Sequence, residues 1–187
     1  MAMSSERTKT LVEIALVIAL AAVLNTLKVW RMPQGGTVSL VMLPIFVIAL
    51  RRGPLVGIVT GALYGVIDFF VDPYPPVHWA QYLLDYPVAY AACGLAGVFQ
   101  PLWRRFAREP RVALAGVASG VVLGSLARYA AHVISGVIFF AEYAEGPVLA
   151  YSLAYNVYVP ISAAACLAAA LVILPTLERA GRGAPTA

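Results

Sequence analysis

The chain has 187 residues, of which 61% are hydrophobic and only 12% are charged, and its mean hydropathy is +0.84. Soluble domains carry about 25% charged residues, so this composition excludes a soluble globular protein and predicts an integral membrane protein. The length fits one compact membrane domain, 1–187, with no stretch polar enough to form a second, soluble domain. The net charge of +4 does not indicate nucleic-acid binding, because the basic residues sit in short clusters between apolar runs.

Six apolar segments predict an all-α bundle of six transmembrane helices. Their expected limits are about 10–27, 38–50, 55–70, 79–99, 112–140 and 148–177. Pro87 is expected to kink the fourth segment near residue 83, and Pro160 to break the sixth. Gly57, Gly61 and Gly65 recur every four residues in the third segment, which predicts very close packing against a neighbouring helix.

Basic residues mark one side of the predicted bundle. Six spans place both termini on the same side, together with ten of the thirteen Lys and Arg residues, and such clusters are typical of cytoplasmic loops. These ten are Arg7, Lys9, Arg51, Arg52, Arg104, Arg105, Arg108, Arg111, Arg179 and Arg182. The opposite side holds Lys28, Arg31, Asp72, Glu142 and Glu145. We therefore expect both termini to be cytoplasmic.

Three segments carry polar residues at the same depth, in the outer half of the membrane. They are 81–87, 128–136 and 151–156. Asp85 is a candidate functional residue, because an ionisable group in a bilayer costs roughly a few kcal/mol or more. Arg128 and His132 lie one turn apart on one helix face, and Tyr151 and Asn156 lie on the last span. We expect the three segments to form one polar pocket that is reached from outside.

Each of these residues also has a purely structural interpretation. Asp85 and Arg128 can form an ion pair that only joins two helices, and His132 can be a core histidine whose hydrogen bonds are satisfied. The tyrosines can belong to the interfacial belt, and Asn156 can be a helix–helix hydrogen-bond donor. The shared depth and side of the polar groups favour a binding pocket.

A pocket with aromatic faces and a carboxylate suits a small, flat, partly cationic heteroaromatic solute. The sequence has no phosphate-binding loop, no HExxH motif and no recognisable nucleophile–base motif. We therefore expect no enzymatic activity, no cofactor and no metal. The sequence predicts a binding protein without its own means of pumping.

Five stretches together resemble the thiamin-specific S components of energy-coupling factor (ECF) transporters. They are 32–36 (MPQGG), 39–45 (SLVMLPI), 81–87 (QYLLDYP), 132–139 (HVISGVIF) and 151–156 (YSLAYN). The resemblance covers nearly the whole chain, and the motifs are specific in combination. It implies a six-helix, multi-pass protein of a prokaryotic plasma membrane that captures thiamin (vitamin B1) from outside with high affinity.

The resemblance also implies partners. S components deliver their vitamin through a module of one transmembrane coupling protein and two ATPases, so that ATP is used by the partner subunits only. Ala15 and Ala19 lie four residues apart in the first span, and small residues at this spacing allow close helix contact in lipid. By resemblance, this face docks on the coupling protein.

The resemblance assigns the site residue by residue. The substrate-binding set that it implies is Asp85, Tyr86, His132, Asn156, Tyr151, Phe140, Trp30, Arg128 and Gly136. Asp85 would accept hydrogen bonds from the aminopyrimidine or balance the thiazolium charge, and Arg128 would hold Asp85 ionised. His132, Phe140 and the lid aromatic Trp30 would stack on the rings. The family pattern has Glu, Lys and Trp at positions 85, 128 and 140, and these three departures put the affinity in question.

Three other functions stay open from the sequence. The solute can be a thiamin precursor pyrimidine or another small vitamin, or the chain can be a membrane enzyme with Asp85 and His132 as general acid and base. It can also be a structural subunit without a ligand. Three experiments separate these functions. Competition with the pyrimidine and thiazole halves of thiamin tests the precursor, and turnover of a bound thiamin analogue would indicate an enzyme. A structural subunit would show no saturable binding of a small molecule.

Overall fold

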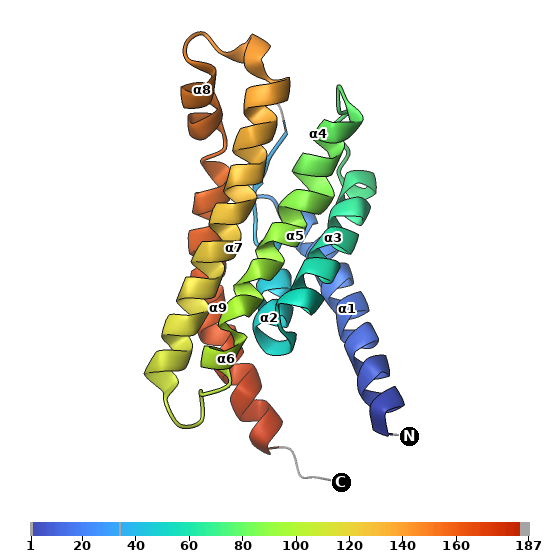
Figure 1. Ribbon diagram of the computed structural model, residues 1–187, viewed down its shortest axis with the longest axis vertical. Coiled ribbons are helices and arrows are strands. Elements are labelled where there is room, and N and C mark those ends of the chain that lie inside the picture. Colours follow the sequence, from blue (N-terminus) through green and yellow to red (C-terminus); the bar gives the residue numbers. More distant parts are fainter. Residues whose placement is uncertain (1, 34, 184–187) are drawn as a thin grey trace.

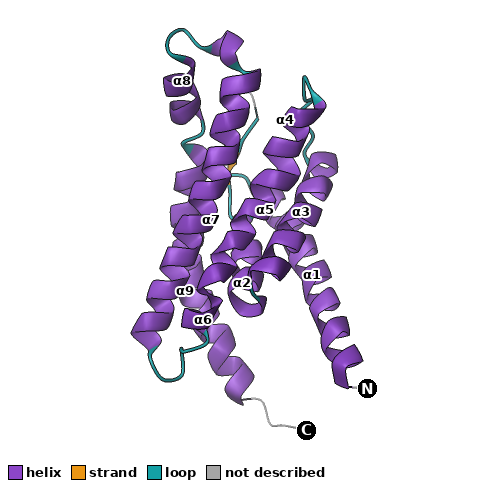
Figure 2. Ribbon diagram, in the orientation of Figure 1, coloured by secondary structure: helices purple, strands orange, loops and turns teal. Residues whose placement is uncertain are grey.

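The computed structural model describes residues 2–33 and 35–183 and is an elongated bundle of helices (Figure 1). The helices are α1 (Ala2–Thr26), α2 (Met42–Arg52), α3 (Pro54–Val71), α4 (Trp79–Leu83), η1 (Leu84–Val88), α5 (Ala89–Cys93), η2 (Gly94–Phe99), α6 (Gln100–Trp103), α7 (Pro110–Phe139), η3 (Ala141–Tyr143), α8 (Val148–Tyr155) and α9 (Tyr158–Gly183). Figure 2 shows how little of the chain is strand or loop. Two short strands, β1 (Trp30–Arg31) and β2 (Thr37–Val38), form an antiparallel hairpin between α1 and α2. Apart from this hairpin, the predicted all-helical class is confirmed.

Five helical segments in the described part of the chain are long and apolar enough to cross a membrane. They are Ser5–Thr26, Pro54–Val71, Trp79–Trp103, Pro110–Phe139 and Val148–Ala180, and they agree with five of the predicted spans to within a few residues. Helix α2 takes the place of the predicted 38–50 span. It begins only at Met42, because the hairpin uses Thr37–Val38, and its 11 residues rise about 16 Å, roughly half of the hydrocarbon core. The six-span arrangement therefore stays a prediction.

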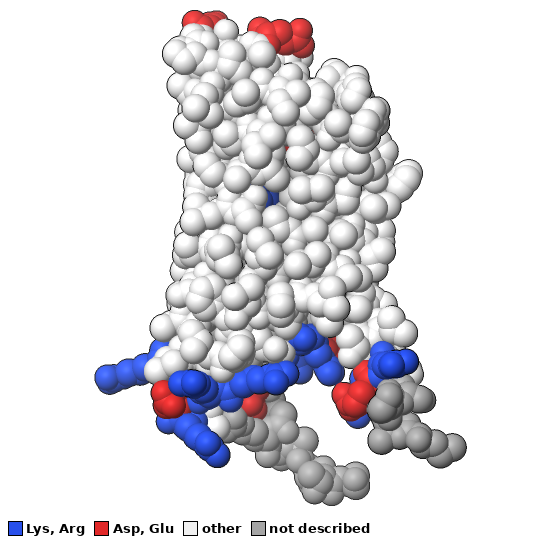
Figure 3. All heavy atoms as spheres, viewed as in Figure 1, with Lys and Arg blue, Asp and Glu red and all other residues white. Residues whose placement is uncertain are grey.

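Both ends of the described chain lie at the same end of the bundle, because the short α2 reverses the chain direction within it (Figure 1). Lys and Arg side chains gather at this end, whereas only acidic side chains are seen at the opposite end (Figure 3). At this end, Arg52 of α2 forms an ion pair with Glu13 of α1, in which its Nε and Nη2 each donate to the carboxylate at 2.7 Å. The basic loops therefore share one end of the molecule, as predicted.

The glycine face of α3 packs directly on the backbone of the segment from η1 to η2. A Cβ at Gly65 would lie 2.5 Å from the carbonyl oxygen of Tyr86, and a Cβ at Gly57 would lie 2.9 Å from Cα of Gly94. Real Cβ atoms essentially never approach other atoms closer than 3.0 Å. The close helix contact predicted from Gly57, Gly61 and Gly65 is confirmed.

Besides the 3₁₀-helical η2, two irregular segments interrupt the long spans. Pro87 lies in η1, a π-helical turn, so the expected disturbance of the fourth span is found there. The sixth span is broken at Asn156, between α8 and α9, rather than at Pro160 as predicted. Pro160 fits into the first turn of α9, because the N–H groups of a first turn have no partner within the helix. The two irregular segments carry the predicted site residues Asp85 and Asn156.

Candidate functional site

A cavity lies between the hairpin segment, α3, the α4–η1–α5 segment, α7 and α8. Its lining includes eight of the nine residues predicted to bind substrate, namely Asp85, Tyr86, Arg128, His132, Gly136, Phe140, Tyr151 and Asn156. The ninth, Trp30, lies on β1 with 65% of its surface exposed and is not part of the lining. The three polar segments predicted from the sequence therefore meet in one place, without the expected lid aromatic.

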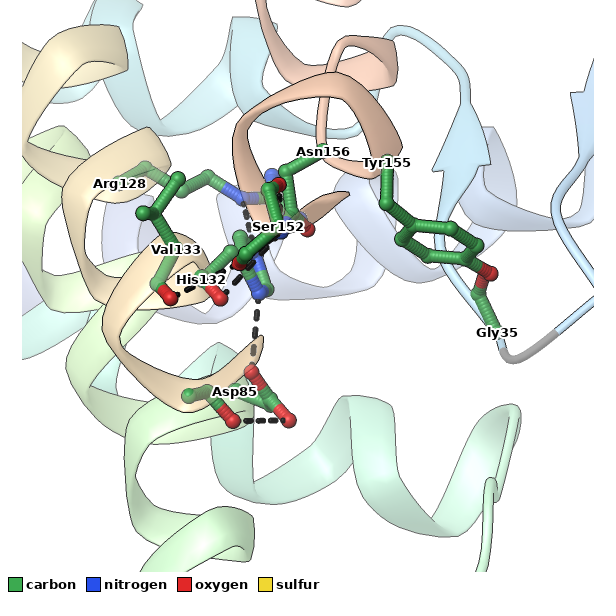
Figure 4. A network of polar contacts seen from close by, with 9 residues as sticks. Gly35, Asp85, Arg128, His132, Val133, Ser152, Tyr155 and Asn156 are labelled. Carbon is green, nitrogen blue, oxygen red and sulfur yellow. Dashed lines mark hydrogen bonds and ion pairs between the residues drawn. The ribbon is translucent and has the colours of Figure 1, made fainter. Parts of the chain in front are cut away.

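Asp85 is held at the cavity wall by two residues of α7. Its Oδ1 lies 3.1 Å from Nδ1 of His132, and its Oδ2 accepts a hydrogen bond of 2.9 Å from Oγ of Ser135. Figure 4 shows the contact with His132 reaching across from η1 to α7. A carboxylate has about four lone-pair sites, and the Asp85 side chain is 19% exposed. Asp85 therefore keeps acceptor capacity for a ligand.

Arg128 turns along its own helix rather than across to Asp85. Its Nε donates to Nε2 of His132 at 3.3 Å, and its guanidinium carbon lies 4.1 Å from the centre of the Tyr90 ring. The i, i+4 spacing places His132 beside it, and the ring face attracts the cation. Among the ion pairs of the described residues, the partner of Asp85 is His132. The ion pair between Asp85 and Arg128 that the sequence left open is not found there, and Arg128 reaches Asp85 only through His132.

Helix α8 closes the cavity against α7 through Ser152 and Asn156. Oγ of Ser152 donates to the carbonyl oxygen of Val133 at 2.9 Å. Nδ2 of Asn156 donates to the carbonyl oxygens of Ser152, at 2.9 Å, and of His132, at 3.4 Å (Figure 4). A Cβ at Gly136 would collide with Oγ of Ser152, so the absence of a side chain allows this approach. Asn156 thus makes the predicted contact between helices and also lines the cavity.

The turn of the hairpin forms another wall. Gly35 and Gly36 have φ angles of 85° and 76°, a left-handed backbone that favours glycine. The carbonyl oxygen of Gly35 accepts a hydrogen bond of 3.1 Å from the Tyr155 hydroxyl (Figure 4). A Cβ at Gly36 would lie 2.6 Å from the Tyr158 ring. The hairpin turn is therefore seated closely on α8 and α9.

Charged residues join the hairpin segment to the loop after α3. Nζ of Lys28 lies 2.6 Å from Oδ2 of Asp72, and Nη2 of Arg31 lies 3.0 Å from Oδ1 of the same carboxylate. Both Arg31 and Asp72 line the cavity, and so does Tyr74, whose backbone N–H donates to the Tyr86 hydroxyl at 3.0 Å. Residues assigned from the sequence only to outer loops thus form part of the site.

Asp68 is the main site residue that the sequence analysis missed. It lines the cavity from α3, is 7% exposed, and accepts hydrogen bonds on Oδ1 from Asn25 at 2.7 Å and from Tyr64 at 2.8 Å. A carboxylate within the apolar 55–70 segment was a signal of the same kind as Asp85. Other lining residues without a predicted role are Asn25, Gly35, Gly36, Thr37, Tyr74, Gln81, Tyr90, Ser152, Tyr155 and Tyr158.

Comparison with known proteins identifies the family. Residues 11–180 match the sequence profile described as "Thiamine transporter protein". The chain belongs to the thiamine transporter family. Over 158 residues it is 42% identical to "Thiamine transporter ThiT" of Bacillus subtilis (strain 168), and the match covers 81% of this chain and 82% of that protein. It is 32% identical over 122 residues to "Thiamine transporter ThiT" of Lacticaseibacillus paracasei, covering 62% and 61% of the two chains.

A solved member of the thiamine transporter family has the same fold. ThiT from Listeria monocytogenes matches with a TM-score of 0.85 and 25% identity, over 93% of this chain and 97% of that one. The family and the apolar helices make this chain a multi-pass protein of the bacterial cell membrane, and the resemblance found in the motifs is confirmed. The relatives are named as transporters rather than enzymes. Among the described residues, no group of three or more His, Cys, Asp or Glu could hold a metal ion.

Proposed function

We propose that this chain is the high-affinity thiamin-binding subunit, or S component, of an ECF-type importer, and that it captures thiamin from outside the cell. The observation that carries the proposal is that eight predicted binding residues line one cavity, in a chain 42% identical to a protein named as a thiamine transporter. Aromatic walls with a carboxylate fit a flat heteroaromatic cation.

Thiamin joins an aminopyrimidine ring to a cationic thiazolium ring, and the cavity offers groups for both. In the proposed complex, Asp85 accepts hydrogen bonds from the aminopyrimidine or balances the thiazolium charge. The rings of His132 and Phe140 stack on the ligand. Tyr151 and Asn156 fix its orientation by hydrogen bonds. Phe140 offers a smaller stacking surface than the tryptophan of the family pattern, so a weaker stacking contribution is expected at this position.

The energy for uptake is proposed to come from a transmembrane coupling protein and two ATPases. Support on this chain comes from α1, where Ala15 and Ala19 are exposed and the neighbouring Leu16 and Leu20 are 64% and 51% exposed. Small residues four apart let a partner helix approach closely. The basic end of the bundle (Figure 3) would face the cytoplasm, with both termini.

Titration calorimetry of the detergent-purified chain alone tests this function. We expect saturable thiamin binding with a Kd between nanomolar and low micromolar, because the cavity lies wholly within this chain. The separate pyrimidine and thiazole halves should bind at least about 100-fold more weakly, since each makes only part of the contacts. Tighter binding of the pyrimidine half than of thiamin would assign the chain to the precursor. Absence of saturable binding would contradict the proposal, and mass spectrometry of the recovered ligand excludes or reveals turnover.

Asp72→Asn is expected to speed up thiamin release. The Asp72 carboxylate holds Lys28 and Arg31 of the hairpin segment, and an amide keeps its shape but not its charge. Partly exposed ion pairs contribute about 1 kcal/mol or less each. We therefore expect the dissociation rate to rise about three- to tenfold, with little change in the association rate. A chase of bound radiolabelled thiamin with excess unlabelled thiamin measures this rate.

The matched control for Asp72→Asn is Glu142→Gln, which removes a carboxylate from the exposed η3 segment outside the cavity lining. Its dissociation rate should equal that of the parent chain. If Asp72→Asn also releases thiamin at the parental rate, the ion pairs at Asp72 do not retain the ligand.

A further inference from the structure

We infer that Arg128 is a positioning residue that fixes the tautomer of the His132 imidazole and thereby keeps Asp85 a hydrogen-bond acceptor for the ligand. This role lies beyond the proposed function, and its main test needs no ligand. Only the expected change in affinity rests on thiamin being the substrate.

The donors and acceptors on the His132 ring decide its tautomer. An Arg side chain carries five N–H donors and no acceptor. Because Nε of Arg128 lies 3.3 Å from Nε2 of His132, Nε2 must offer a lone pair to this contact. A neutral imidazole has its proton on one nitrogen and its acceptor lone pair on the other. The proton of His132 is therefore on Nδ1.

This tautomer determines what Asp85 presents to the cavity. Nδ1–H of His132 points at Oδ1 of Asp85 over 3.1 Å, while the Ser135 hydroxyl donates to Oδ2 at 2.9 Å. With a donor on each oxygen, the carboxyl group acts as an acceptor on both sides. The other tautomer would place the Nε2–H of His132 against the Nε–H of Arg128, and the Nδ1 lone pair against a carboxylate oxygen. With the proton on Nδ1 of His132, Asp85 is an acceptor on both oxygens. A ligand atom that contacts Asp85 must therefore be a donor, such as the N–H of an amino group.

Packing holds Arg128 in the position that this role requires. The guanidinium carbon lies 4.1 Å from the centre of the Tyr90 ring, and Tyr90 is 4% exposed. The Tyr90 ring in turn meets Tyr64 edge-on, with ring centres 4.7 Å apart. Figure 4 shows Arg128, His132 and Asp85 linked in this order by the two contacts. Arg128 therefore acts on Asp85 through the His132 imidazole, which it orients, rather than through its charge alone.

His78, the second of the two histidines of the chain, provides an internal comparison. Its Nδ1 accepts a hydrogen bond of 3.1 Å from the backbone N–H of Ala80 at the start of α4. When His78 is neutral, its proton must therefore be on Nε2. The two imidazoles are expected to be opposite tautomers, which a single spectrum can distinguish.

Nitrogen-15 NMR of histidine-labelled protein without ligand, at mildly alkaline pH, tests the inference. We expect one ring with a protonated Nδ1 and one with a protonated Nε2. His78→Asn should remove only the second ring and so assign the first to His132. A proton on Nε2 of His132 in the parent chain would overturn the proposal.

Arg128→Met tests whether Arg128 is the cause. Met follows the arginine side chain only as far as the Nε position and has no N–H donor, so the His132 proton should appear on Nε2 in a substantial share of molecules. The Kd for thiamin should rise about tenfold. Tyr90→Phe keeps the ring beneath the guanidinium and is the matched control, with His132 expected to stay protonated on Nδ1.

A second variant covers the case in which Arg128→Met does not fold. Arg128→Lys keeps a donor, and His132 is expected to remain protonated on Nδ1 in it. If His132 keeps its Nδ1 proton in Arg128→Met, Asp85 alone sets the tautomer and the positioning role of Arg128 is overturned, whatever the thiamin affinity. If thiamin does not bind to the parent chain but the tautomers are as expected, the inference stands and the proposed function fails.

Discussion

Asp85→Asn is expected to weaken thiamin binding by about 10- to 100-fold. The Asp85 carboxylate accepts contacts from His132 and Ser135 and keeps lone pairs free for the ligand, whereas an amide has one acceptor and one donor end. Losing a hydrogen-bond partner that carries a charge costs about 1.5–3 kcal/mol, and about 1.4 kcal/mol corresponds to a tenfold change in affinity. Titration calorimetry of the purified variant gives the affinity directly.

The charge-retaining control is Asp85→Glu, since the family pattern has Glu at this position. We expect its Kd to stay within about tenfold of the parent, because the acceptor is kept and only its reach changes. Parental affinity of Asp85→Asn would show that Asp85 does not contact thiamin. Equal losses in both variants would show that the length of the side chain matters and its charge does not.

Gly61→Ala is expected to cause the largest loss of stability of any single methyl group added to α3. The new Cβ would lie 2.6 Å from the carbonyl carbon of Tyr90 and closer still to its oxygen. These are backbone atoms, so no side-chain rotation relieves the clash and α3 must move away from α5. Overpacking costs about 1–3 kcal/mol and occasionally more, which for a chain of this length corresponds to a melting temperature lower by about 2–12 °C. Thermal unfolding in detergent measures this change.

Gly146→Ala adds the same methyl group where nothing lies within 4 Å. This substitution in the loop before α8 should change stability by less than about 0.5 kcal/mol. If Gly61→Ala has the same melting temperature as Gly146→Ala and the parent chain, α3 and α5 are not packed as closely as the structure indicates.

The long helices were predictable because few backbone conformations can cross a membrane. A lipid-exposed segment must satisfy its backbone hydrogen bonds within a helix, so apolar length alone indicates a span. The 38–50 segment passed the same test of composition, yet Thr37–Val38 pairs with Trp30–Arg31 in a hairpin. That pairing depends on the turn around Gly35 and Gly36, whose φ angles the apolar pattern does not reveal.

The site was predictable where a polar side chain interrupts an apolar run. Asp85 and His132 were found in this way, and Asp68 would have been found by applying the same rule to α3. The partner of Asp85 was not predictable, because the register between η1 and α7 depends on a π-helical turn, and one additional residue rotates the following side chains by about 100°. The exposure of Trp30 follows from the hairpin and was missed with it.

The separation of charge along the bundle affects how a solute first arrives. On the face drawn in Figure 3, the end opposite the basic loops shows only acidic side chains. The α7–α8 connection there contains Glu142 and Glu145, whereas Lys28 and Arg31 on this side both pair with Asp72. A negative rim concentrates dilute cations and repels anions, over about 8 Å at physiological ionic strength. At the proposed entrance, this field would enrich a monocation before it makes any contact and would oppose the approach of an anionic solute.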